Sequence, residues 1–494
     1  MWEDTKKFRR GRKMSLVAQG YLLVAVSGIC MVLLAFWAKN QFSVDNAEAY
    51  MVAGRGVPAG IIAASIIATE LWAGTIMASA EGVYTWGVAG IWMYALPTGL
   101  SYTVFAFIGP RVRGLLPTGM TIGGWIKRRF DSKAHIIFTL VALYIMLVFA
   151  LFQVVGGAIM LNSVFGMNYQ ISAILVASVF TLNVLIGGLW SSVVSDYIQY
   201  IAVGLIVIFL IPWLIVDAGG PQQIFAGLQS IEGSAQKLDL FRADAFLGYF
   251  AVTLGGWGVI ATLSNSSWQR VFAVDEKKLR KALLFGGWGW VPIALCCSLV
   301  GLIGLSLNLE VTNPSEIFPQ VVQYLLPSGA IIFFAIAVLL AVYSSGDTYL
   351  NGISSMITND IYKEYINKDI SDKQTLKIAR ITAVMVAVTV VLSSLKQVSL
   401  LELMLSTGVM ISAPFFPLVL SLWWKKTSSI AVTLANVLTI GVATYLLLFT
   451  DVPLYVTYIS SYIISLVVTV VVTLIAPDNF DYHALKNESI KSAL

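Results

Sequence analysis

The sequence predicts an all-α polytopic membrane protein, and three observations support that fold class. Hydrophobic residues make up 58% of the 494 positions, and Asp, Glu, Lys and Arg together make up 12%, about half of their share in a typical globular chain. Apolar runs of about 20 residues, the length of one spanning helix, follow one another along the chain. These runs are much longer than the alternating strands of a membrane β-barrel, which have about ten residues. A soluble enzyme, a nucleic-acid-binding protein and a disulfide scaffold are therefore excluded.

The apolar runs, taken in order, predict thirteen spanning helices. The first run is longer than the apolar region of a secretory signal peptide, and it lacks a small-residue cleavage site before Trp37. The predicted spans are residues 16–37, 58–83, 88–109, 134–162, 170–188, 191–216, 246–269, 282–306, 329–350, 379–395, 399–423, 428–449 and 453–476.

The placement of Lys and Arg predicts the orientation of these helices. One alternate set of loops, together with the C-terminal tail, holds 22 of the 31 bases, and the opposite set holds Lys237, Arg242 and Lys396. The positive-inside rule assigns the first set to the cytoplasm of a multi-pass protein in the plasma or inner membrane. An odd number of spans then places the basic N-terminal tail outside. Either this tail is an exception to the rule, or the first run does not cross the membrane simply.

Several carboxylates fall inside or at the rim of the predicted spans, and no Lys or Arg stands mid-span to pair with them. A buried ion costs at least ~2.5–3.5 kcal/mol at a helix centre. Such acids need a proton, water or a bound cation, which favours a pathway for Na⁺ or H⁺ over acids that are protonated and bonded to a neighbouring helix. The five acids are Glu70, Glu81, Asp196, Asp347 and Glu402.

A polar segment lies in the ninth predicted span. Positions three and four apart share one face of a helix, so Ala341, Ser344 and Ser345 present a carbonyl and two hydroxyls together, and Asp347 and Thr348 continue that face. Oxygen ligands of this kind suit a hard cation such as Na⁺. The alternative interpretation is that these small residues only allow close helix packing.

Two predicted spans carry polar and small residues in their middle, at 67–75 and at 255–270. Residues of these kinds weaken a continuous helix. Broken helices expose backbone carbonyls in the middle of the membrane, where transporters bind ions and solutes. The two spans lie five helices apart, which indicates an inverted five-helix repeat with the site at its interface.

The residues that carry these patterns resemble the sodium/solute symporter family, which includes proline, sugar, choline, sialic acid and urea carriers. The resemblance covers roughly residues 50 to 450. The matching segments are Ala341 to Ser345 with Asp347, Thr358 to Lys363, Gly187 to Trp190, Ser195 to Gln199, Trp268 to Arg270, and Ala53 to Gly56.

This resemblance implies a LeuT-like fold with one extra N-terminal and two extra C-terminal helices. It assigns residues 1–57 to the N-terminal tail, the first helix and a cytoplasmic loop. It assigns residues 58–216 to the first repeat and residues 217–423 to the second repeat, which includes a long external loop. Residues 424–494 are assigned to the last two helices and a cytoplasmic tail.

The resemblance also implies a sodium site and a second cation position. Asp347 is an acid where some family members have serine, so that position could hold an ion or a proton. The sodium ligands implied are Ala68, Leu71, Ala341, Ser344 and Ser345, and the second position comprises Asp196, Ser344, Asp347 and Thr348.

The implied activity is sodium-coupled import of a small polar organic solute by alternating access. Glu70 among aromatic residues favours a cationic or zwitterionic amine or amino-acid-like substrate, with urea or another neutral solute as the alternative. The implied substrate residues are Thr69, Glu70, Trp72, Trp92, Gln153, Trp257, Ser264 and Asn265.

Other classes of protein have less support in the sequence. A channel would need a continuous pore, whereas the acids stand on non-equivalent helices. A transporter-like sensor usually carries an appended soluble domain, and only about 18 residues follow residue 476. A membrane enzyme is not expected, because no nucleophile–base pair, metal-ligand spacing or phosphate loop is present. We expect no nucleic-acid partner, and the oligomeric state stays open.

Overall fold

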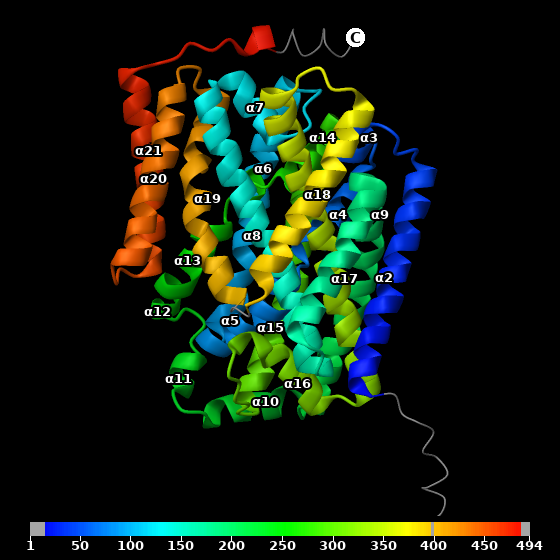
Figure 1. The fold of residues 1–494 in the computed structure, drawn as a ribbon. Coiled ribbons are helices and arrows are strands. Elements are labelled where there is room, and N and C mark those ends of the chain that lie inside the picture. Colours follow the sequence, from blue (N-terminus) through cyan, green and yellow to red (C-terminus); the bar gives the residue numbers. More distant parts are fainter. Residues whose placement is uncertain (1–14, 397–399, 486–494) are drawn as a thin grey trace, which may run out of the picture.

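The computed structural model describes residues 15–396 and 400–485, whose helices form one bundle along a common axis (Figure 1). Within these residues, β pairing is confined to an isolated bridge between Val57 and Val274. The predicted all-α class is therefore confirmed. The helices of the first half are α2 (Leu16–Gln41), α3 (Ala47–Val52), α4 (Ala59–Glu70), the π-helical turn η2 (Gly74–Ala78), α5 (Ser79–Trp86), α6 (Ala89–Leu115), α7 (Ile122–Arg129), α8 (Ser132–Phe165) and α9 (Tyr169–Asp217).

The second half begins with short helices and continues with long ones. These elements are α10 (Gly220–Ser230), α11 (Ser234–Lys237), α12 (Ala243–Ala245), η3 (Phe246–Phe250), α13 (Ala251–Trp257), η4 (Ile260–Thr262), α14 (Asn265–Ala273), α15 (Glu276–Ser306), α16 (Ile317–Leu325), α17 (Ser328–Met356), η6 (Ile357–Ile366), α18 (Asp372–Ser394), α19 (Leu400–Trp423), α20 (Ser429–Phe449) and α21 (Leu454–Ile475).

Within the described residues, every predicted apolar run falls on one or more helices. Among the described residues, ten helices are long and apolar enough to span a membrane, or eleven with the bent pair α4 and α5. Helix α9 covers two predicted spans. Its 49 residues would extend about 74 Å if straight, more than twice the hydrocarbon core of a bilayer. The count of thirteen spans stays a prediction.

Helix α9 is divided at Gly188, whose backbone (φ 54°, ψ −138°) is not helical. A Cβ atom at this position would lie 2.5 Å from the carbonyl oxygen of Tyr50. Only glycine combines this positive φ with such a close backbone approach. The break therefore has a local cause, and it separates Asn183 from Ser192 and Asp196 along the chain.

Both predicted interruptions are present in the structure. Helix α4 ends at Glu70, and the chain bends by 61° before it continues through η2 into α5. The second break follows Trp257, where α13 ends and the chain passes through η4 to α14. Helix α4 packs against α9, α15 and α17, and α17 packs against α8 and α9. The first break is thus enclosed by long helices.

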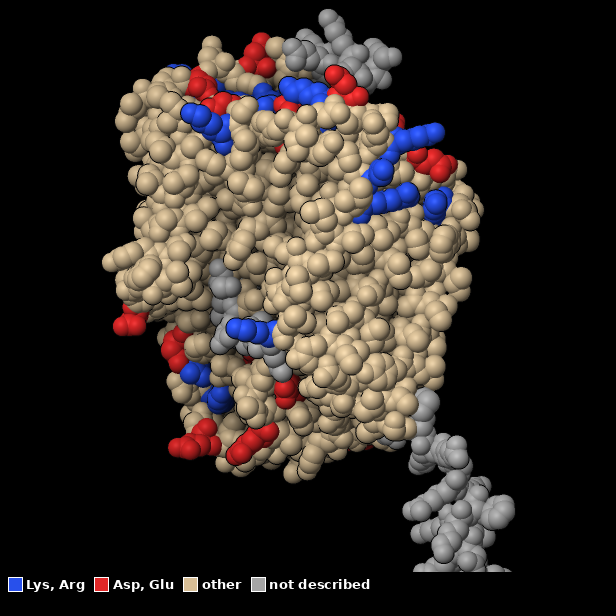
Figure 2. All heavy atoms as spheres, in the orientation of Figure 1, with Lys and Arg blue, Asp and Glu red and all other residues tan. Residues whose placement is uncertain are grey.

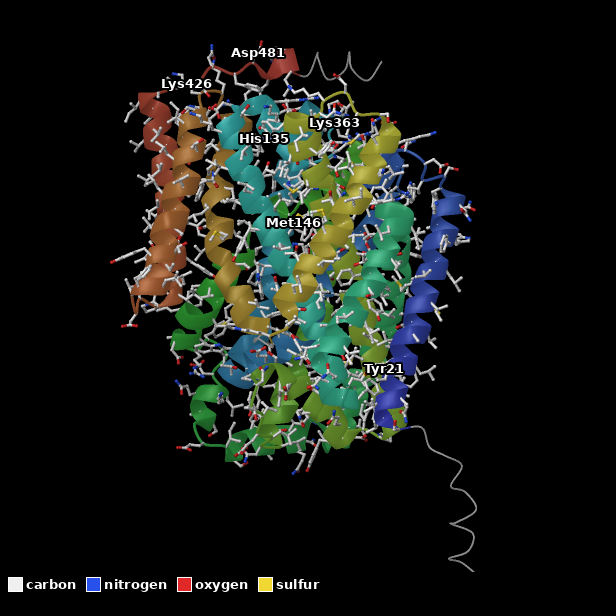
Figure 3. All side chains as sticks on the ribbon, in the orientation of Figure 1. Tyr21, His135, Met146, Lys363, Lys426 and Asp481 are labelled. Atoms are coloured by element: carbon white, nitrogen blue, oxygen red, sulfur yellow. The ribbon has the colours of Figure 1, made fainter. Side chains whose placement is uncertain are left out.

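The two ends of the bundle differ in charge. Figure 2 shows Lys and Arg gathered at the end that carries α3 and α7, with few at the end of α10 and α11. In Figure 3, Lys363, Lys426 and His135 lie toward the first end and Tyr21 of α2 toward the other. This pattern agrees with the orientation predicted from the loops. The six bases of the N-terminal tail lie outside the described residues.

Candidate functional site

The predicted sodium residues lie where the last turn of α4 meets the middle of α17. The hydroxyl of Ser345 donates to the carbonyl oxygen of Thr69 at 2.7 Å. Ser344 is one residue earlier, and its hydroxyl donates to Asp196 Oδ1 at 2.5 Å. The sodium residues that surround this contact are buried. They are Ala68, Leu71, Ala341, Ser344 and Ser345.

The local backbone explains why carbonyls are available there. Leu71 follows α4 with ψ 45°, outside the helical range. The turn leaves carbonyl oxygens at the end of α4 without the usual i+4 partner, as at any helix C-terminus. Oxygen donors without a net charge, such as carbonyls and hydroxyls, are suitable ligands for a hard cation. The donor set therefore fits sodium.

A buried arginine corrects the expectation that the acids have no base beside them. Arg270 in α14 is 1% exposed, Asp196 in α9 is 0% exposed, and their Nη2 and Oδ2 atoms are 2.8 Å apart. The sequence predicts that Arg270 lies in a cytoplasmic loop, because it stands at the end of the predicted span 246–269. Helix α14 instead continues to Ala273 and carries the guanidinium into the interior.

Asp347 belongs to a neighbouring set of polar contacts across α9 and α17. Ser192 Oγ donates to Asp347 Oδ1 at 2.8 Å, and the Asn183 amide donates to Oδ2. The hydroxyls of Ser192 and Thr348 are also 2.8 Å apart. The residues of the predicted second cation position are therefore brought together, but each has internal partners.

Glu70 lies at the end of α4 beside the first break. The Tyr102 hydroxyl of α6 donates to Glu70 Oε1 at 2.8 Å. The Glu70 carbonyl accepts hydrogen bonds from Thr75 and from the indole of Trp290 in α15. Since the side chain and the backbone are held by different helices, the carboxylate is fixed close to the break.

Aromatic rings join the two breaks. The Trp72 ring lies 5.9 Å from that of Trp257 and 4.6 Å from that of Phe152. Trp257 also contacts Tyr94, with ring centroids 5.1 Å apart. The Trp72 indole nitrogen is buried and has no hydrogen-bond partner among the described residues. We call Trp72, Phe152, Trp257 and Tyr94 the aromatic cluster.

Gln153 supports this arrangement from α8. Its Oε1 accepts a hydrogen bond from the Ala73 backbone N–H at 3.2 Å, within the first break. Ser264 lies in the second break, where its hydroxyl is 2.5 Å from that of Ser266. Thr69 Oγ1 accepts from Arg270 Nη2 at 2.7 Å. These predicted substrate residues thus have positions at or beside the two breaks.

Two other predicted substrate residues have contacts elsewhere. Trp92 donates from its indole to the carbonyl of Leu240, between α11 and α12, at 2.9 Å. Asn265 accepts from the backbone N–H of Ile122 and donates to the carbonyl of Gly352, both at 3.2 Å. The structure does not bring these two side chains into the aromatic cluster.

The remaining predicted acids lie apart from this centre or cannot be placed. Glu81 of α5 accepts a hydrogen bond from Ser315 Oγ at 2.7 Å. The side chain of Glu402 lies outside those that the structure describes. Of the four acids whose side chains the structure describes, Glu70, Asp196 and Asp347 therefore belong to the centre formed by α4, α9, α14 and α17.

Sequence reasoning missed several residues of this centre. Ser65 is one turn before Thr69 and bonds both Asp196 Oδ2 and Arg270 Nε, at 2.5 and 2.9 Å. Asn183 and Ser192 flank the Gly188 break. The apolar residues Val271–Val274 after Arg270 were an available signal, since they indicate that the span continues past the charge.

Similarity to solved structures defines the fold. The chain superposes on a Na⁺-coupled sialic acid symporter in a substrate-bound outward-open state with a TM-score of 0.77, at 18% identity, over 93% of this chain and 99% of that one. Mhp1, a nucleobase-cation-symport-1 family transporter, gives a TM-score of 0.56 at 15% identity over 89% and 98% of the chains. The fold is that of LeuT-type membrane transporters.

Residues 50–433 match the sodium:solute symporter family. The chain therefore belongs to this family, whose members are secondary active symporters and not enzymes. The rice (Oryza sativa subsp. japonica) urea-proton symporter DUR3 is 25% identical over 460 residues, which are 85% of this chain and 64% of that protein. The chain thus spans less than two thirds of that relative. The osmoregulated proline transporter OpuE of Bacillus subtilis (strain 168) is 26% identical over 85% of this chain and 87% of that protein.

Proposed function

We propose that this symporter imports a small polar organic solute together with sodium. The observation that carries the proposal is the contact between Ser345 and Thr69, at 2.7 Å, between α17 and the broken α4. Sodium held by carbonyls of α4 and hydroxyls of α17 would join the same two helices. Ion and solute then stabilise one arrangement of the first break, so each raises the affinity for the other.

The chain's own groups account for alternating access in this proposal. The first break places Trp72 in the aromatic cluster and Glu70 beside Tyr102. Movement of α17 away from α4 would separate the Ser345 and Thr69 contact and release the ion. The same movement would disturb the backbone that holds the solute residues. Coupling follows because one segment serves both sites.

The first candidate substrate is an amine or an amino-acid-like compound. The observation that favours it is the buried carboxylate of Glu70 close to aromatic rings, an arrangement that binds cations by charge pairing and cation–π contact. The likeness to a proline transporter agrees with a zwitterionic solute. An organic anion is disfavoured because the carboxylate would repel it.

The second candidate is urea or another neutral amide, and a different observation favours it. The Trp72 indole N–H is buried without a partner among the described residues. A solute carbonyl would satisfy this donor, and the N–H groups of an amide could donate to Glu70. Several relatives are named as urea transporters, including one of Saccharomyces cerevisiae at 22% identity.

A thermal-shift screen of the purified protein would test ion and solute together. Sodium alone should raise Tm relative to potassium, and a substrate should add stabilisation that depends on sodium, because ligands stabilise the state that binds them. Amines, amino acids, urea and sugars form the panel. Stabilisation by substrate that is equal in sodium and potassium would contradict sodium coupling.

Uptake into proteoliposomes under a sodium or a proton gradient then identifies the driving ion, since one relative is named a proton symporter. Saturable uptake that stops when the gradient collapses excludes a channel.

A further inference from the structure

At the centre of the molecule, Arg270 donates hydrogen bonds to residues of four helices, one of which is its own helix α14. Its Nε bonds Ser65 on α4 at 2.9 Å, and its Nη1 bonds the Ser266 carbonyl on α14 at 3.0 Å. Its Nη2 bonds Thr69 of α4, Asp196 of α9 and Thr348 of α17, at 2.7, 2.8 and 3.0 Å. The guanidinium is therefore surrounded by oxygen atoms, as a bound cation would be.

These contacts use the oxygens that the resemblance assigned to a second cation. Asp196 Oδ2 and Thr348 Oγ1 both accept from Arg270, and Asp196 Oδ1 accepts from Ser344. Asp347 accepts from Ser192 and Asn183 instead. A second metal ion on Asp196 and Thr348 would lie directly against the positively charged guanidinium, which already contacts both side chains at 2.8 and 3.0 Å, and like charges at that distance repel each other. The residues present therefore do not fit a second sodium.

We propose that the guanidinium of Arg270 takes the place of a second coupling cation, so that the protein binds one sodium ion. The inference rests on the proposed sodium coupling. A fixed positive charge satisfies Asp196 throughout the cycle, because removal of one partner from a buried pair is strongly unfavourable. The sodium between α4 and α17 is then the single sodium ion that is exchanged.

Thr69 connects the fixed charge to the exchangeable ion. Its side-chain hydroxyl accepts from Arg270, and its backbone carbonyl accepts from Ser345. The residue is thus held on one side by α14 and on the other by α17. Arg270 positions the last turn of α4, and that turn supplies carbonyls to the sodium site.

Sodium stoichiometry in the wild-type protein tests the proposal directly. Binding of ²²Na⁺ to purified protein should saturate at one ion per chain, with a Hill coefficient of about 1. Two ions per chain would overturn the proposal while leaving sodium coupling intact. Absence of sodium binding would overturn both this inference and the proposed function, so the two failures can be distinguished.

Arg270→Gln provides the second test. Without the guanidinium, Asp196 is a buried carboxylate that needs a cation, and a second sodium should bind, raising the stoichiometry to two. A folded Arg270→Gln variant that still binds one sodium with unchanged affinity would contradict the proposal. Arg129→Gln is the matched control, because Arg129 is also buried but donates to the carbonyls of Trp424, Lys425 and Thr427. If Arg270→Gln fails to fold, the wild-type stoichiometry decides.

Discussion

The hydroxyl of Ser345 donates a hydrogen bond to the carbonyl oxygen of Thr69 at 2.7 Å, although the two residues are 276 positions apart in the chain. The bond joins the middle of α17 to the end of α4, just before the bend of 61°. A contact at this place is sensitive to any sliding of the two helices. The ion site and the conformational change are therefore expected to share it.

Replacement of both hydroxyls tests the ion site. Ser344→Ala with Ser345→Ala should abolish sodium stimulation of uptake, because two ligands and the contact with Thr69 are lost. Solute uptake with and without sodium, together with Tm, gives the measurement. Ser354→Ala is the control, since that hydroxyl bonds Asn351 within the same helix. Retained sodium dependence in the folded double variant would show that the ion binds elsewhere.

Glu70→Gln distinguishes the two substrate classes. For a cationic or zwitterionic solute the change removes the opposite charge, and KM should rise at least tenfold. A neutral amide needs only a hydrogen-bond acceptor, which glutamine keeps, so KM for urea should change less than about threefold. Kinetics in proteoliposomes measure both values. An unchanged KM for every amine and amino acid that is transported would remove the argument for the first class.

Trp72→Phe tests the unpartnered indole. The ring stays in the aromatic cluster, but the N–H donor is lost. A net hydrogen bond contributes about 0.5–1.5 kcal/mol, so the KM of a carbonyl-bearing solute should rise between about twofold and tenfold. Trp92→Phe is the matched control, because that indole bonds the carbonyl of Leu240 between α11 and α12. Equal effects of the two substitutions would argue against solute contact by Trp72.

The helices and their breaks could be predicted because their signals are local in the sequence. Apolar runs mark the spans, and the glycines and hydroxyl residues near Glu70 and Trp257 weaken the helix where they stand. The predicted ends of the spans were less accurate where charged residues follow an apolar run. The span predicted to end at residue 109 continues as α6 to Leu115. Arg113 remains compatible with that helix because its guanidinium bonds the carbonyl of Pro117.

The interior role of Arg270 could not be predicted in the same way. A single arginine close to Lys277 and Lys278 has the appearance of a cytoplasmic charge, and its partner Asp196 is 74 positions away. Only the packing of α14 against the centre shows that it is buried. The contacts of Asn265 could not be predicted for a related reason, because the helical pattern shows that α14 is polar but not which helix each side chain meets.

The position of Asn265 leads to a prediction about access from the basic end of the molecule. Its Oδ1 accepts from the first backbone N–H of α7, at Ile122, and its Nδ2 donates to the Gly352 carbonyl of α17. One side chain thus joins α7, α14 and α17. Opening of the centre toward this end by movement of α14 away from both α7 and α17 would break both hydrogen bonds.

Asn265→Ala should therefore favour the state that is open toward the basic end. Two hydrogen bonds of about 1 kcal/mol each correspond to a shift in the population ratio of up to about 30-fold, and the apparent sodium affinity falls with the population that binds sodium. Sodium titrations by thermal shift and deuterium exchange over residues 121–129 report the two effects. Asn436→Ala is the control, because that amide bonds Val432 within α20. Unchanged affinity and exchange in a folded Asn265→Ala variant would show that these two bonds do not hold the centre closed.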